Sequence, residues 1–452
     1  MHPTVKCFLC VILISFLASC SSVTGSVTTT NAVNSETPEE TAMPATSPTP
    51  TATPTAEPPT PLPPSPTPSL FDIELPVGEV KYEIPLNIRH VTEDSATLFF
   101  ELDTPSRGYV SVRSRETGAF PFTIPLDPSQ ARHLVTAHNL VSGSTYDALV
   151  AYEAEEGGYS QPRFLDRTWG PVSFHTRAEG APLRIGVIGD ASFGDKTTTG
   201  LVDAMADANL DFIIHAGDVV DRIAANANPF DSYKENFYAP FEPLLTMMPV
   251  YTVPGNHDYD RDINYEGEPF YYYAFPPFPD PRFPGQEYAE RNQHYAIAYG
   301  DAQFVMLDTQ VFYGEPGREE QESWLEERLA DPGFKVTIPV FHVAPFNSST
   351  VHPDDSRPVR GTWVPKFEAA NVILTLSGHF HTYERLMKNA ITYVISSGGS
   401  SVLYAKGEKA PESKLYKRES HYLLMELDSE TMTYTAINLE GDVIDEVTIP
   451  LE

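Results

Sequence analysis

Residues 183–190, Leu-Arg-Ile-Gly-Val-Ile-Gly-Asp, are the segment that indicates the fold class most clearly. Its first six residues form an almost continuous apolar run, which is typical of a strand that is buried on both faces. A second such run, Phe-Ile-Ile-His at 212–215, follows a stretch around 201–210 that we expect to be helical. Buried strands that alternate with helices in this way predict a layered α/β domain.

The same pattern continues towards the C-terminus. We predict further buried strands at 250–253, 303–307, 336–341 and 372–376. We predict helices at about 230–247 and 318–330, and in the second of these an apolar stripe is formed by Trp324, Leu325 and Leu329. After residue 390 the sequence is rich in strand patterns again, so we expect one α/β domain to extend over residues 183–452.

Residues 71–178 contain short runs in which apolar and polar residues alternate, separated by turn signals. Clear examples are residues 96–100, 108–112 and 146–152. Alternation at this spacing predicts an all-β sandwich. Within it, His-Asn-Leu-Val-Ser-Gly-Ser-Thr-Tyr at 138–146 resembles a corner of fibronectin type III domains, and Phe-His-Thr-Arg at 174–177 resembles their closing strand. No catalytic motif is visible in this region.

The first 70 residues are interpreted as an export signal and a tether. Lys6 precedes a short apolar run that suits a signal peptide, and Leu-Ala-Ser-Cys at 17–20 resembles the bacterial lipobox. We therefore expect residues 1–20 to be a lipoprotein signal peptide, with an ordinary signal peptide as the alternative. Residues 21–70, rich in Thr and Pro, predict a disordered tether. The protein would then be extracytoplasmic, anchored to a bacterial cell membrane through lipid on Cys20.

Charge and composition exclude several classes of function. Lys and Arg number 30 against 62 Asp and Glu, which gives a net charge of −32. Such a surface repels phosphate backbones, so we expect no nucleic-acid partner, and an anionic substrate must be attracted locally by metal ions. The cysteines are Cys7, Cys10 and Cys20, which excludes disulfides and thiolate zinc sites from the folded region. Neither a G-x-S-x-G elbow nor a P-loop is present.

Residue types that bind metals follow nearly every predicted strand. The strands lead into Gly-Asp at 189–190, His-Ala-Gly-Asp-Val-Val-Asp at 215–221, Gly-Asn-His-Asp at 255–258, His342, and Gly-His-Phe-His at 378–381. The carboxyl ends of strands in an open α/β sheet converge on one crevice. Carboxylate, imidazole and amide ligands without thiolate suit iron, zinc, manganese or cobalt. Each motif alone is weak, because Gly-Asp is commonly a turn, but five in this order indicate a metal centre.

The order Asp … GDxxx … GNHD … His … GHxH resembles the calcineurin-like metallophosphoesterases. Its extension over 378–385, Gly-His-Phe-His-Thr-Tyr-Glu-Arg, resembles a signature of the purple acid phosphatases. The resemblance covers residues 80–450 and implies a layered α/β/β/α sandwich, preceded by the all-β fibronectin type III-like sandwich. It also implies two metal ions bridged by Asp218. The further ligands that it implies are Asp190 and His381 for the first ion and Asn256, His342 and His379 for the second.

The resemblance implies roles for two more histidines. His257 matches a histidine that faces the substrate phosphate, and His352 falls where these phosphatases place a histidine over the leaving group. We expect His352 to assist the leaving group, with His257 as the alternative. The sequence departs from the family at Asp221, which replaces the tyrosine that binds Fe(III), and at Asp-Ala-Ser 190–192, where the family has Asp-x-Gly. Asp221 either ligates a metal or hydrogen-bonds within its loop, and the purple chromophore is not expected.

The predicted chemistry is phosphoric ester hydrolysis. Two ions of iron, zinc or manganese, about 3.5–4 Å apart, would supply a metal-bound hydroxide for in-line attack and neutralise the phosphoryl oxygens. The leading hypothesis is an acid phosphatase-like phosphomonoesterase with a small phosphorylated substrate. The alternatives are a phosphodiesterase or nucleotide hydrolase with the same site, and an inactive surface binding protein. The aromatic-rich segment 259–299 either shapes the substrate site or packs on the core.

Overall fold

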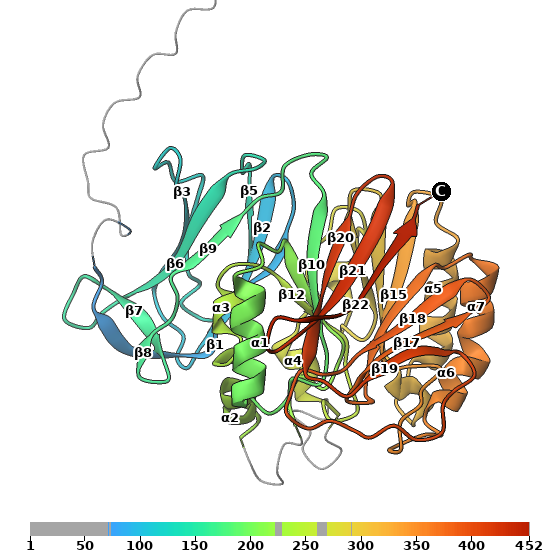
Figure 1. Cartoon of the computed structure of the whole chain (residues 1–452). Helices are drawn as coiled ribbons and strands as arrows, with labels where there is room; N and C mark the ends of the chain where they lie inside the picture. Colours follow the sequence, from blue (N-terminus) through green and yellow to red (C-terminus); the bar gives the residue numbers. More distant parts are fainter. Residues whose placement is uncertain (1–70, 72–73, 222–227, 260–268, 291, 452) are drawn as a thin grey trace, which may run out of the picture. The chain divides into compact units, whose positions relative to one another are not determined.

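The computed structural model describes residues 71, 74–221, 228–259, 269–290 and 292–451, and every structural statement below refers to these residues (Figure 1). The predicted signal peptide, the lipidation cysteine Cys20 and the predicted tether lie outside them. Among the described helices, none combines the length and the apolar character that crossing a membrane requires.

The first part of the described chain consists of strands joined by turns. Its strands pair in the order β4-β3-β6-β7-β1-β2-β5, with β8 added to β7 and β9 added to β6. The strands are β1 (Val77–Val91), β2 (Ser95–Leu102), β3 (Gly108–Ser114), β4 (Phe122–Pro125), β5 (Arg132–His138), β6 (Thr145–Glu153), β7 (Tyr159–Phe164), β8 (Arg167–Thr168) and β9 (Val172–His175). The alternating runs that the sequence singled out lie within β2, β3 and β6. That this region is a fibronectin type III-like domain stays a prediction.

Two further sheets follow along the chain. The six-stranded sheet has the order β12-β11-β10-β20-β21-β22, and the seven-stranded sheet has the order β13-β14-β15-β16-β18-β17-β19. The strands of the first are β10 (Leu183–Ile188), β11 (Phe212–His215), β12 (Val250–Thr252), β20 (His421–Leu427), β21 (Thr431–Asn438) and β22 (Val443–Pro450). Those of the second are β13 (Tyr295–Tyr299), β14 (Ala302–Leu307), β15 (Val336–Val343), β16 (Leu374–Gly378), β17 (Tyr383–Lys388), β18 (Ile391–Ser396) and β19 (Ser413–Lys417).

The buried side chains show that the two sheets pack face to face. Ile185 and Val187 of β10 share one apolar cluster with Phe304 and Met306 of β14. The next residue, Ile188, belongs instead to a cluster on the opposite face of the six-stranded sheet. The prediction that this strand is buried on both faces is therefore confirmed, because side chains alternate between the two faces of a strand.

Helices cover the outer faces of both sheets. Leu201, Val202 and Met205 of α1 (Lys196–Ala206) pack on the six-stranded sheet. On the seven-stranded sheet lie α5 (Arg318–Leu329), α6 (Ser356–Thr362) and α7 (Val364–Ala369), which group together in Figure 1. The layers therefore follow the order helix, sheet, sheet, helix. The remaining helical elements are short: α2 (Pro229–Tyr233), the π-helix η1 (Lys234–Tyr238), α3 (Glu242–Leu245), α4 (Phe270–Ala274), η2 (Gln286–Tyr288) and η3 (Gln310–Phe312).

Some predicted elements differ from the observed ones. The helix expected at 201–210 begins earlier, at Lys196, because Asp195 caps its N-terminus by accepting a hydrogen bond from the main-chain N–H of Thr198. The single helix expected at 230–247 is divided into α2, η1 and α3. Pro240 explains the break between η1 and α3, since proline lacks the N–H that a continuous helix needs, whereas Pro243 lies within the first turn of α3. The strand expected at 372–376 is shifted by two residues, to β16.

The aromatic-rich segment packs into the interior where the structure describes it. Phe270, Tyr271, Phe275 and Phe278 are all buried, whereas Tyr288 is exposed. This supports the packing interpretation of the segment for these residues. Tyr265, which also belongs to it, lies outside the described residues.

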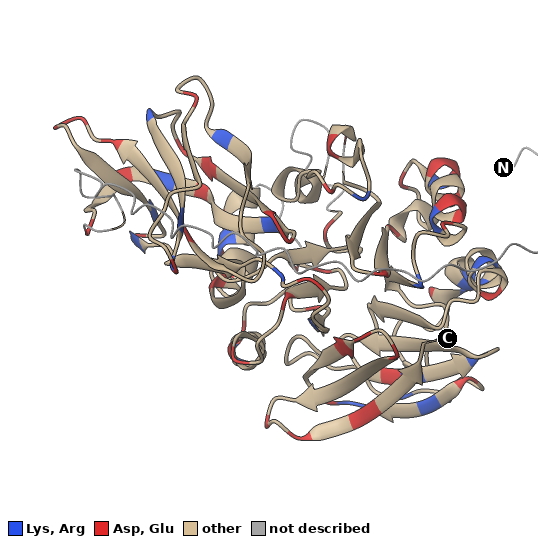
Figure 2. Ribbon diagram, turned by 90° about the horizontal axis from the view of Figure 1, so that it is seen from above, with Lys and Arg blue, Asp and Glu red and all other residues tan. Residues whose placement is uncertain are grey.

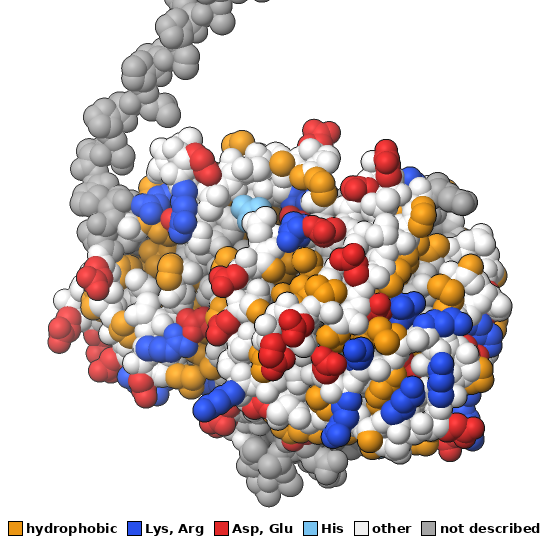
Figure 3. All heavy atoms as spheres, viewed as in Figure 1, with side chains coloured by type: hydrophobic (Ala, Val, Ile, Leu, Met, Phe, Trp, Pro, Cys, Tyr) orange, Lys and Arg blue, Asp and Glu red, His pale blue; other side chains and the backbone are white. Residues whose placement is uncertain are grey.

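Acidic side chains are distributed over strands and helices alike (Figure 2). On the face shown in Figure 3, acidic and basic side chains of the described residues are interspersed with apolar ones. The large net negative charge is therefore spread over the fold.

Candidate metal centre

The motifs that follow the predicted strands meet at the carboxyl ends of the central strands. Asp190 follows β10, Asp218 follows β11, and the Asn256 loop follows β12. His342 lies near the end of β15, and His379 directly follows β16. Since β10, β11 and β12 run parallel in one sheet, and β15 and β16 run parallel in the other, their carboxyl ends carry these side chains to one place.

The backbone is unusual at four of the predicted ligands. Asp190, Asp218, His379 and His381 have φ angles of 58°, 52°, 75° and 44°, in the left-handed region that residues other than glycine rarely adopt. Such conformations cost free energy and persist where the surrounding structure enforces them, which is common at functional sites. The loops are therefore built to present these side chains, at a local cost to backbone stability.

Two glycines make the close approach of the loops possible. A Cβ atom added at Gly217 would lie 2.7 Å from Cγ of His342. A Cβ atom added at Gly255 would lie 2.8 Å from Cγ of Asp218. Both distances are well below ordinary van der Waals contact, so only glycine fits at these positions.

One group of possible metal ligands consists of Asp190, Asp218 and His381. Each offers a ligand atom within 4.8 Å of the others, and all three side chains are buried. Nε2 of His381 lies 3.4 Å from Oδ1 of Asp190. Ser397, which the sequence analysis did not single out, orders this group: its hydroxyl donates to Asp190 and accepts a hydrogen bond from the main-chain N–H of His381.

A second group gathers around His342, which is fully buried. Its Nε2 lies 3.2 Å from Oδ1 of Asn256, 3.3 Å from Nδ1 of His379 and 3.3 Å from Oδ1 of Asp218. Asp218 therefore belongs to both groups. This is the arrangement that a carboxylate bridging two ions requires.

The outward-facing nitrogen of each of three predicted ligand histidines contacts a hydrogen-bond acceptor, which fixes its tautomer. Nδ1 of His342 lies 2.8 Å from the carbonyl oxygen of Ala216, and Nδ1 of His381 lies 2.8 Å from that of Val402. A carbonyl only accepts, so each of these nitrogens carries the hydrogen atom. In neutral imidazole the other nitrogen, Nε2, then presents a lone pair to the site.

His379 follows the same rule with the two nitrogens exchanged. Its Nε2 lies 3.1 Å from a carboxylate oxygen of Asp355, which leaves Nδ1 to face Nε2 of His342. When the histidines are neutral, lone pairs of nitrogen and oxygen face one another in both groups, and either a metal ion or a proton on Nε2 of His342 relieves their repulsion. Metal-ligating histidines typically donate their other N–H to a carbonyl or carboxylate in this way. The residues present fit a centre of two metal ions.

The electrostatics of the site also favour positive charge. Burial alone would lower the pKa of His342, but the carboxylates of Asp218 and Asp190 raise it to about 10. Burial alone would raise the pKa of Asp218, but His342 and His257 hold it well below its usual value. A site that holds its carboxylate ionised and stabilises a buried cation in the absence of metal is suited to divalent ions.

A buried carboxyl group accepts hydrogen bonds from two of the loops that carry predicted metal ligands. Asp258 accepts hydrogen bonds from the main-chain N–H groups of Val219, Val220 and Gly255. Burial, and then the neighbouring carboxylate of Asp218, raise the pKa of Asp258 to about 7. Its contacts hold the loops that carry Asp218 and Asn256 side by side.

His257 and Asp221 lie at the rim of this centre. Nδ1 of His257 is 3.4 Å from Oδ1 of Asp221, and its Nε2 is 4.0 Å from Oδ2 of Asp218. The Asp221 side chain is 45 % exposed and is not part of the group formed by Asp190, Asp218 and His381. Asp221 thus contacts a histidine of another loop, and which of the two roles considered for it applies stays a prediction.

His352 lies on the other side, against His379. The His352 side chain is 52 % exposed, and its ring centroid is 5.3 Å from that of His379. The loop that carries it has a φ of 56° at His352. The structure thus brings His352, with a half-exposed side chain, next to a predicted ligand.

Sequence reasoning missed Tyr404. Its ring stacks on His381 with the centroids 4.3 Å apart and the planes at 12°. Burial, and then the carboxylates of Asp190 and Asp218, raise its pKa, so its hydroxyl stays protonated at neutral pH. Tyr404 lies in the loop after β18, and this loop contains no recognisable motif. No signal in the sequence therefore marked it.

Comparison with known proteins agrees with this geometry. Residues 183–383 match the family model of calcineurin-like phosphoesterases. A probable purple acid phosphatase 20 of Arabidopsis thaliana is 26 % identical over 222 residues, covering 48 % of this chain and 49 % of the relative. Purple acid phosphatase 23 of the same plant is 26 % identical over 244 residues, covering 48 % and 51 %. The chain thus spans about half the length of the curated relatives it matches.

Two solved structures share the fold. A purple acid phosphatase from yellow lupin (Lupinus luteus) seeds superposes with a TM-score of 0.64 at 16 % identity, covering 81 % of this chain and 74 % of that one. The structure of PhoD gives a TM-score of 0.57 at 14 % identity, covering 81 % and 89 %. At these identities the likeness concerns the fold alone.

Proposed function

We propose that this protein is a metal-dependent phosphoester hydrolase with a dinuclear centre, and that it acts as a phosphomonoesterase. The observation that carries the proposal is the convergence of carboxylate, amide and imidazole side chains in two groups that share Asp218. The similarity of residues 183–383 to calcineurin-like phosphoesterases supports the same assignment.

The proposal assigns Asp218 as the bridging ligand, because it contacts His342 in one group and belongs to the other group as well. Asp190 and His381 would complete the shell of the first ion. The ligands that would complete the second shell are Asn256, His342 and His379. The donor set contains oxygen and imidazole nitrogen only, which suits iron, zinc or manganese.

When bound, such a pair of ions supplies Lewis acidity towards phosphoryl oxygens and lowers the pKa of a bound water. The chain itself holds its ligands in fixed tautomers and keeps Asp218 ionised. In this proposal His257, which contacts Asp221, would donate a hydrogen bond to a phosphate oxygen. His352, whose side chain is half-exposed, would give a proton to the leaving oxygen, a contribution of roughly 10²–10⁴-fold in rate.

An acidic protein needs such a centre to bind a phosphate monoester. With a net charge of −32, the protein as a whole repels the substrate, and salt screens this repulsion at separations beyond about 10 Å. At shorter range the two ions and the histidines supply the attraction. We infer that binding of the substrate depends on metal, and that the distribution of Lys and Arg contributes little to it.

The test is an initial-rate comparison with the full chain, stripped by chelator and reconstituted separately with Mn²⁺, Zn²⁺ and Fe²⁺. We expect metal-restored turnover of p-nitrophenyl phosphate, faster than that of bis-p-nitrophenyl phosphate. His342→Ala should lower kcat/KM by more than the roughly 10–100-fold that loss of an outer-shell partner of a metal ligand costs. The matched control, His138→Ala, replaces an exposed histidine at the end of β5 and should leave the rate unchanged.

The outcomes separate the hypotheses. Faster turnover of the diester would favour the phosphodiesterase alternative. Binding of no metal would remove the dinuclear centre and favour the inactive binding protein.

A further inference from the structure

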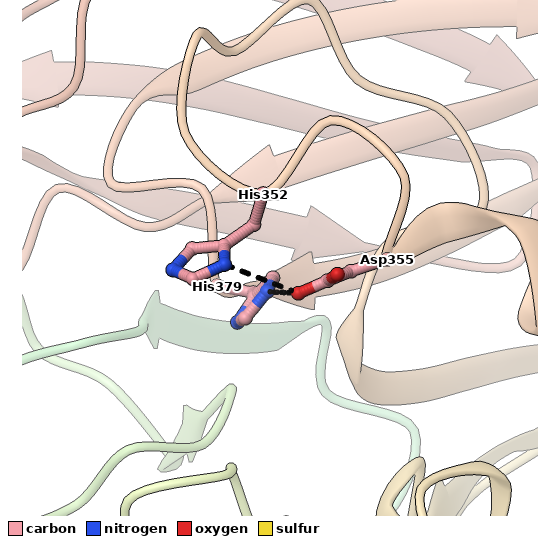
Figure 4. A group of neighbouring side chains, drawn as sticks. All are labelled: His352, Asp355 and His379. Carbon is pink, nitrogen blue, oxygen red and sulfur yellow. Dashed lines mark hydrogen bonds and ion pairs between the residues drawn. The ribbon is translucent and has the colours of Figure 1, made fainter. Parts of the chain in front are cut away.

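A carboxylate outside the predicted ligand set connects two histidines of the site. Oδ2 of Asp355 lies 3.1 Å from Nε2 of His379 and 3.4 Å from Nδ1 of His352 (Figure 4). One oxygen atom thus contacts both rings. His379 belongs to the predicted metal ligands, whereas His352 is the predicted leaving-group histidine, so Asp355 stands between the two parts of the proposed machinery.

The position of Asp355 on its helix shows that this contact replaces a common one. Asp355 is the N-cap residue of α6, where an aspartate typically accepts hydrogen bonds from the first N–H groups of the helix. Its side chain makes no such capping bond. The helix α6 forgoes the stabilisation that a capping bond supplies while the carboxylate faces the histidines.

The main chain of Asp355 is held on both sides. Its N–H donates to the carbonyl oxygen of His352 over 3.1 Å, which closes the turn between the two residues. Its carbonyl oxygen accepts a hydrogen bond from the hydroxyl of Tyr313 at 2.5 Å. The backbone of Asp355 is therefore held in place, and its carboxylate extends from it to the two histidines.

The consequence for His379 is a defined tautomer. Because Nε2–H donates to Asp355, Nδ1 is left to face Nε2 of His342 in the metal centre. The consequence for His352 is a defined direction. With Nδ1 facing Asp355, the other ring nitrogen points away from the carboxylate (Figure 4).

We propose that Asp355 is a positioning residue, which aligns the ligand His379 and the leaving-group histidine His352 through one shared carboxylate oxygen. The inference rests on the proposed function and adds a link that the ligand set does not contain. Because the oxygen is shared, a change at Asp355 affects metal affinity and leaving-group assistance together. Substitution of a residue with a purely structural role would not selectively change the metal affinity or the leaving-group assistance.

The closest competing explanation is a cation at the outer group itself. His352, Asp355 and His379 offer ligand atoms within 4.8 Å of one another. In that case His379 would turn its Nε2 to a third ion, and removing Asp355 would abolish that ion's binding. Counting the bound metal ions distinguishes this explanation from the proposal.

The experiment compares the full chain with Asp355→Ala, Asp355→Asn and the control Asp354→Asn. Asp354 is the neighbouring carboxylate, and its side chain is 69 % exposed and pairs with Arg357. Two readouts are measured. The first is Mn²⁺ affinity by chelator competition, with the number of bound ions. The second is the ratio of kcat/KM for p-nitrophenyl phosphate to that for ethyl phosphate, whose alkoxide leaving group depends on a proton donor.

We expect Asp355→Ala to weaken the affinity for one Mn²⁺ by about 10–100-fold, without changing the number of ions bound. We expect it to raise the aryl-to-alkyl ratio at least about tenfold, since assistance by a general acid matters most for the poorer leaving group. Asp355→Asn retains an oxygen that accepts one hydrogen bond and should give a smaller effect on both readouts. It also serves as the second variant if Asp355→Ala does not fold. Asp354→Asn should resemble the wild type.

The results that overturn the inference differ from those that overturn the proposed function. An active wild type whose Asp355 variants keep both the affinity and the ratio would refute the inference alone. Loss of one whole equivalent of metal, with unchanged affinity for the others, would assign the outer group as a cation site instead. If the wild type binds two ions but hydrolyses neither ester, the proposed function fails. The affinity readout then still decides whether Asp355 positions His379.

Discussion

Gly255→Ala is the most direct test of the idea that the loops carrying the predicted ligands leave no space for a further atom between them. Gly255 precedes Asn256 in the loop after β12, and its Cα faces the carboxylate of Asp218. An added Cβ would lie 2.8 Å from Cγ of Asp218, and closer still to its Oδ1 and main-chain nitrogen. The substitution adds one methyl group and changes no charge. Any effect on the centre therefore comes from displacement.

The expected magnitude follows from the size of that displacement. Carbon atoms in contact prefer a separation of about 3.5–4.0 Å, so Asp218 or the loop must move by about 1 Å. Overpacking of this kind typically costs about 1–3 kcal/mol of stability. A misplacement of about 1 Å at catalytic groups costs about 10²-fold in rate, which is about 2.7 kcal/mol of transition-state stabilisation. We therefore expect kcat/KM of Gly255→Ala to fall by about 10²-fold with a modest loss of melting temperature.

The assay is turnover of p-nitrophenyl phosphate by the Mn²⁺-loaded full chain, with thermal unfolding measured on the same samples. The matched control is Gly361→Ala, because a Cβ at Gly361 meets no atom within 4 Å. Gly361 lies in α6, where alanine is favoured over glycine by about 1 kcal/mol, so this variant should be active and at least as stable. Unchanged kcat/KM in Gly255→Ala would refute the claim that Asp218 is confined by the Gly255 loop.

Two further predictions concern stability. His421 is fully buried, its Nδ1 lies 2.9 Å from the carbonyl oxygen of Glu419, and burial lowers its pKa to about 4. In the unfolded chain the pKa of this histidine is about 6.5. The contribution of neutral His421 to the free energy of unfolding is therefore fully present above pH 6.5 and is lost as the pH falls from 6.5 towards 4. Between pH 7 and pH 5 the wild type should thus lose about 2 kcal/mol more than His421→Gln in urea titrations, and equal losses would contradict the assignment. Removal of metal by chelator should lower the melting temperature of the full chain, and Mn²⁺ at about 100 times its Kd should restore about 2.7 kcal/mol; a melting temperature that ignores metal would contradict a centre formed in the folded state.

The position of the site could be predicted from the sequence because each strand and the polar residue at its end are specified by neighbouring residues in the chain. An apolar run that ends in Gly-Asp specifies both a buried strand and a polar residue at its carboxyl end. When several such runs are parallel, their ends must meet, which is why Asp190, Asp218 and Asn256 lie together. His342 and His379 follow by the same argument in the second sheet.

Other features could not be predicted because they depend on contacts that leave no sequence pattern. Tyr404 reaches His381 from a loop after β18, and stacking of that kind has no characteristic spacing. The break between η1 and α3 is a different case, because Pro240 marks it in the sequence and the apolar periodicity of residues 230–247 obscured it. Asp355 resembled an ordinary helix cap, and only its geometry relates it to the histidines.

The three outward partners of the histidines differ in how they can be tested. His342 and His381 are held by main-chain carbonyl oxygens, which no substitution at Ala216 or Val402 removes. His379 alone is held by a side chain, that of Asp355. Rotation of the imidazole at His379 can therefore be released without changing a ligand, whereas at the other two histidines it cannot. If the tautomers of the ligands are what prepares this centre for metal, the effect must be visible at Asp355, and its absence there would weaken the tautomer argument for all three histidines.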